Sequence, residues 1–149
     1  MVVIRAIAIG DAEAVAELAR QLGYERTEAQ IVDWVRALAG REHEQQAFVA
    51  CMGEAVVGWI EVATVRHLQS DAHGLIGGLV VKEGVRGAGM GRELCRHAER
   101  WVAERGLTAM RVTSRSTRER AHLFYERDGY RRVKMSVVFE KDLCGTGER

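Results

Sequence analysis

The stretch "LVVKEGVRGAGMGREL" (Leu79–Leu94) decides the fold of this chain. It starts as an apolar β-type run and ends as the beginning of an amphipathic helix, with glycines at 84, 87, 89 and 91 between them. Glycine is costly to order, so a cluster of glycines indicates that the backbone must approach another group closely. The first N–H groups of a helix have no internal partner and can bind an anion. Arg86 adds a fixed charge with paired donors, so the stretch predicts a diphosphate site at a strand-to-helix turn.

Two common phosphate-binding loops do not fit these letters. A Walker A loop needs GxxxxGK[ST], whereas Met90 and Gly91 follow Gly89. A Rossmann fingerprint needs GxGxxG near the first strand of a βαβ unit, whereas GxGxG stands here after three predicted strands. The spacing therefore excludes a Walker A loop and argues against a nucleotide-binding dehydrogenase domain.

The remaining sequence predicts strands and helices on both sides of this turn. The near-continuous apolar run at 74–81 predicts a strand covered on both faces. Consecutive strands before it favour antiparallel pairing, while the strand–helix–strand order over 75–113 favours a parallel pair. We therefore expect an α/β (α+β) fold with a mixed, mostly antiparallel central sheet and helices on both faces. The predicted strands are 1–9, 46–52, 55–65, 74–81 and 107–114, the predicted helices begin near 11, 27, 90 and 116, and 130–143 is predicted as closing β-structure.

Local signals set the expected ends of these elements. Asp11 is predicted to cap the first helix, and Thr27 with Gln30 forms a capping box for the second. Ser116 with Glu119 predicts another capping box. The polar run 66–73 reads as a loop, the pair Gly53-Glu54 as a hairpin turn, and Gly106 and Gly129 as helix stops.

Composition and charge narrow the class of protein. The 149 residues predict one domain over 1–142 with a tail at 143–149. Neither a secretory signal nor a membrane-spanning run is found, and three scattered cysteines predict thiols in a reducing cytoplasm. Residues 1–75 hold 6 Lys/Arg and 11 Asp/Glu, whereas 76–149 hold 16 and 10, so the basic half is compatible with a polyanionic ligand. Arginines on the helix after the turn are interspersed with glutamates, so we expect no nucleic-acid partner. His97 and His122 have no other His or Cys at the spacing of a metal site, so we expect no metal.

Arg86, Gly89 and Gly91 fill the pattern R-x-x-G-x-G. This pattern resembles the acetyl-CoA signature of the GCN5-related N-acetyltransferase (GNAT) family. A second segment, "RAHLFYERDGY", is similar to the A-x-x-[FL]-Y-x-x-x-G-[FY] stretch of that family, which Ala121, Phe124, Tyr125, Gly129 and Tyr130 fill. The two motifs stand in the family's order, and the resemblance covers residues 1 to about 142.

The resemblance implies a fold, a cofactor and an activity. It implies a GNAT-type acyl-CoA fold that binds acetyl-CoA (coenzyme A) and moves an acetyl group to a primary amine by direct transfer. Tyr125 would be the general acid, because a phenol with an unperturbed pKa of about 10 can protonate a departing thiolate. The strand edge at 79–81 would pair with the pantetheine arm, and Arg118 would approach the 3′-phosphate. The cofactor-binding residues that follow are Leu79, Val80, Val81, Arg86, Gly87, Ala88, Gly89, Met90, Gly91, Arg92, Arg118 and Phe124.

The sequence departs from the family pattern at the expected general base. Many members carry a Glu two residues before the position of Leu79, where this chain has Gly77. Three substitutes remain open: Glu61 on the predicted strand 55–65, His73 at the start of the predicted strand that contains Gly77, or a water held by backbone carbonyls. Glu61 and His73 are therefore the candidate bases.

The acceptor is predicted to be a small amine. In the family, the segment between the first two helices overhangs the acceptor site. Its counterpart here, with the loop 66–73, would form a partly acidic and aromatic rim that suits a cationic amine such as an aminoglycoside or a polyamine. A protein or peptide N-acetyltransferase and a non-catalytic acyl-CoA sensor remain alternatives, and a homodimer is a partner that the resemblance allows. The predicted rim consists of Tyr24, Glu25, Glu28, Asp71 and His73.

Overall fold

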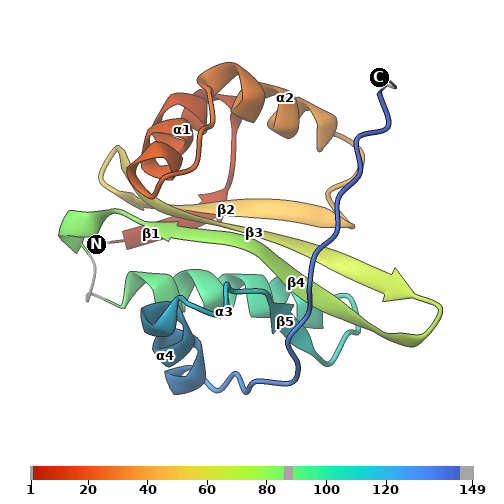
Figure 1. Cartoon of the computed structure of the whole chain (residues 1–149). Helices are drawn as coiled ribbons and strands as arrows, with labels where there is room; N and C mark the ends of the chain where they lie inside the picture. Colours follow the sequence, from red (N-terminus) through yellow and green to blue (C-terminus); the bar gives the residue numbers. More distant parts are fainter. Residues whose placement is uncertain (1, 86–88, 145–149) are drawn as a thin grey trace. The chain divides into compact units, whose positions relative to one another are not determined.

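The computed structural model of the chain describes residues 2–85 and 89–144. Its contacts divide the chain into two compact units, 1–113 and 114–149. The first unit contains a five-stranded sheet in the order β1-β2-β3-β4-β5, antiparallel except for the parallel pair β4–β5 (Figure 1). In chain order its elements are β1 (Val2–Ala6), η1 (Ile9–Asp11), α1 (Ala12–Gln21), α2 (Glu28–Ala37), β2 (Gln45–Met52), β3 (Ala55–His67), β4 (Ser70–Val81), η2 (Glu83–Val85), α3 (Met90–Ala103) and β5 (Met110–Val112).

Helices cover both faces of the sheet, which confirms the predicted fold class. Figure 1 shows α1 and α2 on one face and α3 on the other. Val15 of α1 packs with Val49 and Cys51 of β2 in a buried cluster. On the opposite face, Leu94 of α3 is fully buried, 3.2 Å from the position that a Cβ would take at Gly58. The sheet is therefore the middle of three layers, as the apolar run of β4 predicts.

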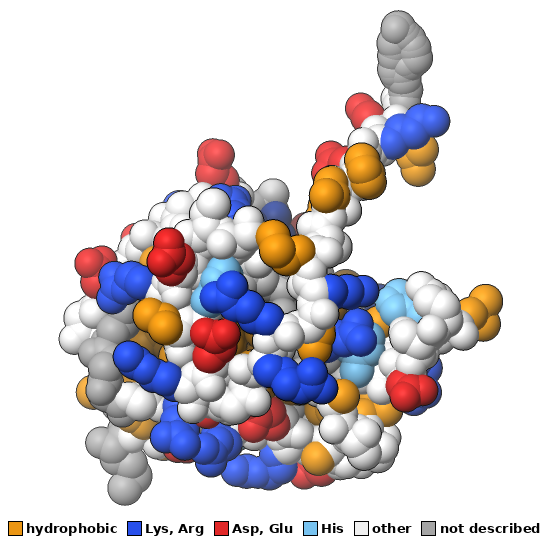
Figure 2. All heavy atoms as spheres, turned by 60° about the horizontal axis from the view of Figure 1, so that its bottom comes forward, with side chains coloured by type: hydrophobic (Ala, Val, Ile, Leu, Met, Phe, Trp, Pro, Cys, Tyr) orange, Lys and Arg blue, Asp and Glu red, His pale blue; other side chains and the backbone are white. Residues whose placement is uncertain are grey.

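The outward side of α3 is polar, whereas its inward side is apolar. Leu94, Cys95 and Ala98 are fully buried, and Arg92, Glu93, Arg96 and Arg100 are exposed. Figure 2 shows acidic side chains among the basic ones on the face that it turns forward. This mixed pattern is typical of an exposed helix face.

The sequence signals at helix ends have different outcomes. The Thr27–Gln30 capping box is present: Gln30 N–H donates to Thr27 Oγ1 (3.1 Å), and Thr27 N–H donates to Gln30 Oε1 (3.0 Å).

The predicted loop 66–73 is wrong, because β3 and β4 continue through it and close in a tight hairpin with His67 opposite Ser70. Polar residues are compatible with these antiparallel strands, because one face of an exposed hairpin is in contact with solvent.

Asp11 lies at the N-terminus of α1 but its side chain does not cap that helix. Its carboxylate accepts two hydrogen bonds from Arg5, both 2.8 Å, and one from Ala8 N–H, also 2.8 Å. The Arg5 hydrogen bonds hold the pKa of Asp11 below its ordinary value, against the effect of burial. The ion pair connects β1 to the start of α1. Asp11 is only 6 % exposed, and burial of its charge is tolerated because Arg5 and Ala8 N–H satisfy the carboxylate.

Asp11→Asn is expected to lower the free energy of unfolding by roughly 2 kcal/mol near neutral pH, because Arg5 loses its charged partner. The pKa of Asp11 is depressed in the folded state, so its contribution is fully present above the unfolded pKa of about 3.9. That contribution is lost as the pH falls through the folded pKa. Urea unfolding of both proteins at several pH values should therefore give a constant difference near neutrality that shrinks below about pH 4. A difference that grows in acid contradicts this role.

The second unit contains α4 (Glu119–Arg127), which Gly129 follows with a φ of +95°. The predicted Ser116 capping box is wrong: α4 begins after Arg118, and no side chain caps it. The predicted β-structure over 130–143 is also wrong, since no strand occurs there in the described part of the unit and its apolar side chains are exposed. Alternating apolar residues give a segment β-propensity, but a strand also needs a hydrogen-bonded partner, which local sequence does not specify.

Candidate active site

A β-bulge interrupts β4 at Gly77. Glu61 of β3 is opposite Gly78, and the next residue, Val62, is opposite Ile76. Gly77 is therefore an extra residue of β4 that has no paired residue on β3 in this register. Such a bulge leaves its extra residue out of the ladder and redirects the neighbouring side chains. The bulge lies at the position where the resemblance places a Glu in other family members.

The Glu61 carboxylate occupies the space beside Gly77. A Cβ built on Gly77 would lie 2.9 Å from Glu61 Oε2 and 3.1 Å from Oε1. Glu61 is half-buried, and Gln45 Nε2 donates to its Oε2 at 3.2 Å. Any larger residue at 77 would displace this carboxylate, so the glycine is what admits Glu61 to this position.

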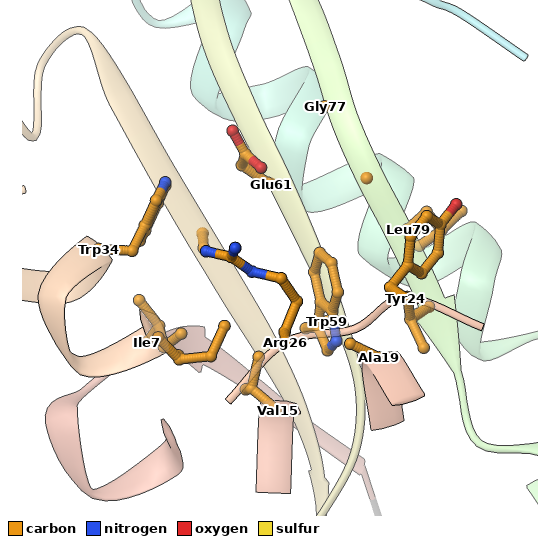
Figure 3. A pocket seen from close by; sticks show the side chains of 14 residues that line it. Ile7, Val15, Ala19, Tyr24, Arg26, Trp34, Trp59, Glu61, Gly77 and Leu79 are labelled. Atoms are coloured by element: carbon orange, nitrogen blue, oxygen red, sulfur yellow. The ribbon is translucent and has the colours of Figure 1, made fainter. Parts of the chain in front are cut away.

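A pocket opens on the α1–α2 side of this bulge (Figure 3). Its cavity volume is about 230 Å³. Figure 3 shows the Arg26 guanidinium and the Glu61 carboxylate projecting into it, with aromatic rings on its sides. Its wall is formed by Ile7, Val15, Ala19, Tyr24, Arg26, Ile31, Trp34, Ala47, Trp59, Glu61, Gly77, Gly78, Leu79 and Val80. One acidic and one basic side chain thus share an otherwise mostly apolar pocket.

Strand pairing between β4 and β5 ends just before the bulge. Parallel pairing joins Gly74 to Met110 and ends with Ile76 opposite Val112, whereas pairing to β3 continues to Val81. Leu79, Val80 and Val81 therefore lie where β4 and β5 have parted. Of these three predicted cofactor-binding residues, Leu79 and Val80 also line the pocket.

The helix that follows the glycine-rich turn begins as the motif predicts. Gly89 is the residue before α3, with φ +80° in the left-handed region, and none of the described side chains caps the helix. A Cβ at Gly89 would meet no atom within 4 Å, so the space beside it is open. Met90 is buried and holds the first turn, in which Gly91 and Arg92 follow. Arg86, Gly87 and Ala88 lie outside the described residues.

The remaining predicted residues belong to the second unit. Arg118 precedes α4 and is exposed. Tyr125 is half-buried, and its ring makes edge contacts with Phe124 (5.1 Å between centroids) and Tyr130 (5.7 Å). The aromatic residues of the second motif thus form a cluster that fixes the Tyr125 ring within its own unit.

Of the five residues predicted for the acceptor rim, only Tyr24 lines the pocket. His73 is buried near the far end of β4, with its Nδ1 3.1 Å from the carbonyl oxygen of Asp71. Sequence reasoning missed Arg26, Trp34 and Trp59. Trp59 had a usable signal, because residues 59 and 61 of one strand lie on the same face. Arg26 had none, since its direction depends on the turn between α1 and α2.

A scan against models of protein families matches residues 12–130 to the acetyltransferase (GNAT) family. The chain belongs to the GNAT family. The predicted resemblance is thereby confirmed, and the protein is an acyltransferase that uses acetyl-CoA. Among curated proteins, none matches the sequence significantly.

Solved structures with the same fold cover nearly the whole chain. A transcriptional regulator from Bacillus halodurans C-125 is 27 % identical, with a TM-score of 0.78 and coverage of 95 % of this chain and 100 % of that one. The apo aminoglycoside 6′-N-acetyltransferase of Acinetobacter haemolyticus is 18 % identical, with a TM-score of 0.79 and coverage of 95 % and 99 %. Another aminoglycoside acetyltransferase, AAC(6′)-Iy in complex with a bisubstrate CoA analogue, is 16 % identical, with a TM-score of 0.81 and coverage of 95 % and 99 %.

The described residues fit this cofactor in two respects. Leu79 and Val80 lie beyond the last β4–β5 pair, on a strand edge of the kind that pairs with the amides of a pantetheine arm. Among the described residues, no side chain caps the start of α3 and no atom lies within 4 Å of a Cβ built on Gly89, which leaves room for an anionic group. Within residues 2–85 and 89–144, no cluster of His, Cys, Asp or Glu suits a metal ion, and no helix has the length and apolar character to cross a membrane.

Proposed function

We propose that this protein acetylates a primary amine of a small molecule, which binds in the pocket beside the β4 bulge. The observation that carries the proposal is the position of the Glu61 carboxylate, next to Gly77 and inside a cavity of about 230 Å³. That volume suits a small acceptor. The aminoglycoside acetyltransferases of the same fold support a small-molecule amine as well.

In the proposed reaction the N–C bond to the acetyl group forms and the C–S bond of the thioester breaks. The attacking nitrogen must lose a proton, and Glu61 is the proposed base that takes it, directly or through one water. The departing sulfur must gain a proton, and Tyr125 is the proposed acid that supplies it from its phenol oxygen. The contact of Glu61 with Gln45 orients the carboxylate in the pocket. His73 is a weaker candidate base, because it is buried and does not line the pocket.

Further predictions concern the cofactor contacts, the charge of the acceptor, the oligomeric state, the domain bounds and the location of the protein. Arg118, Phe124 and the loop residues Arg86, Gly87 and Ala88 are proposed to contact the cofactor. The cationic character of the acceptor, the homodimer, the single domain over 1–142 and the cytoplasmic location stay predictions.

Thiol release from acetyl-CoA tests the proposal. The panel contains aminoglycosides, polyamines, amino sugars, amino acids and lysine-containing peptides. Release with one class of small amine is the expected result. Release with peptides alone would assign the protein to peptide acetylation. Tight CoA binding with no release for any amine would instead support the sensor alternative.

A further inference from the structure

The acceptor pocket contains a cation that the family chemistry does not require. Arg26 lies in the short connection between α1 and α2, and Figure 3 shows its guanidinium within the pocket, between Trp34 and Trp59 in that view. In the described part of the chain, no hydrogen bond or ion pair engages this guanidinium. A positive charge at an amine-binding site opposes a polycationic acceptor.

The backbone around Arg26 holds it in place. Arg26 N–H donates to the carbonyl oxygen of Tyr24 at 3.1 Å, and Arg20 Nη1 of α1 donates to the carbonyl oxygen of Arg26 at 3.0 Å. Arg20 is itself paired with Glu17 at 2.7 Å. The backbone of the connection is thus tied to α1, and the exposed Arg26 side chain extends from it into the pocket.

The other features of the pocket complete a two-charge arrangement. Glu61 supplies the one carboxylate among the described residues of the lining, and it suits an ammonium group. Arg26 supplies paired donors, which match the two oxygens of a carboxylate or phosphate. Trp34, Trp59 and Tyr24 add flat, mostly apolar surface to the same lining.

Resting on the proposed function, we infer that the acceptor is an amine that also carries an anionic group, with Arg26 as the specificity-determining residue. The chemistry that the pocket recognises is an ammonium and an anion joined by an apolar or aromatic body. A carboxylate or a phosphate can supply the anion. The apolar walls favour an amino carboxylate, such as an aromatic amino acid, over a sugar phosphate.

The test compares acceptors that differ only in the anion. Phenylalanine and phenethylamine form one pair, and glucosamine 6-phosphate and glucosamine form the other. Each is assayed by thiol release with the wild type and with Arg26→Gln. The expected result is a preference for the charged member of one pair, with a KM for that member that rises about 30-fold in Arg26→Gln. The KM for the uncharged member should change less than about twofold.

Two further measurements keep the outcome interpretable. Arg36→Gln, which alters an exposed Arg of α2 outside the pocket lining, should leave both KM values unchanged. Calorimetric binding of N-acetylphenylalanine and N-acetylglucosamine 6-phosphate to the CoA-loaded protein needs no turnover. Binding that Arg26→Gln weakens supports the inference even if the proposed activity fails. The inference is overturned if uncharged amines are acetylated equally well, if Arg26→Gln impairs both members of a pair equally, or if neither acetylated product binds.

Discussion

Glu61→Gln is expected to lower kcat/KM for the acceptor amine by about 100-fold, while the affinity for CoA stays unchanged. The amide keeps the shape of the side chain and can still accept the hydrogen bond from Gln45, so the loss isolates proton transfer. The variant should recover part of its activity as the pH rises, because a larger fraction of the amine then arrives unprotonated. Steady-state rates across a pH series, with CoA binding measured separately, check both statements.

Two companion variants sharpen this result. Glu54→Gln changes an exposed residue of the β2–β3 turn and should leave the rate unaltered. The double variant E61A/G77E moves the carboxylate from β3 to the bulge, where the family commonly carries it, and should exceed E61A alone in activity. If Glu61→Gln turns over like the wild type at every pH, the base is another group, and a backbone-held water becomes the leading candidate.

Tyr125→Phe is expected to lower kcat by about 100-fold with little change in CoA affinity. The substitution removes only the phenol hydroxyl and keeps the ring that contacts Phe124 and Tyr130, so α4 should remain folded. The loss should be smaller for an acetyl thioester of an acidic aryl thiol, because that sulfur leaves without needing a proton. Comparing kcat for acetyl-CoA and the aryl thioester measures this difference directly.

Tyr130→Phe is the matched control, since it removes the same hydroxyl from the neighbouring ring of the same cluster. It should retain most of the wild-type kcat. Equal losses in the two variants, or a Tyr125→Phe loss that is the same for both thioesters, would remove Tyr125 as the acid.

The sequence predicted most of the sheet unit because its signals are local. Gly89 marked the start of α3, and the Thr27–Gln30 pair marked the start of α2 through contacts within one turn. The apolar run at 74–81 marked a strand with two covered faces. Glu61 could be named as a substitute base because Gly77 stood where the family has a Glu. Its approach to Gly77 depends on the bulge, which no local pattern revealed.

The errors concern features that depend on distant partners. Ser116 has the residue types of a capping box, but α4 starts three residues later, at Glu119. The stretch 130–143 has strand-like alternation without a described partner strand. Asp11 was expected to cap α1, but Arg5 competes for its carboxylate with a stronger charged interaction. Arg26 was missed because a side chain in a connection carries no periodic signal.

The bulge at Gly77 also reverses the parity of β4. Before it, even-numbered positions face α3: a Cβ at Gly74 would overlap Val102, and Ile76 is opposite the buried Val62. After it, even-numbered positions face the pocket: a Cβ at Gly78 would touch Trp59, and Val80 is opposite Trp59. The even-numbered positions of one strand thus face the hydrophobic core along its first part and the proposed acceptor pocket along its last. Sequence changes two residues apart, at 76 and 78, should therefore be judged by different criteria, one by stability and the other by specificity.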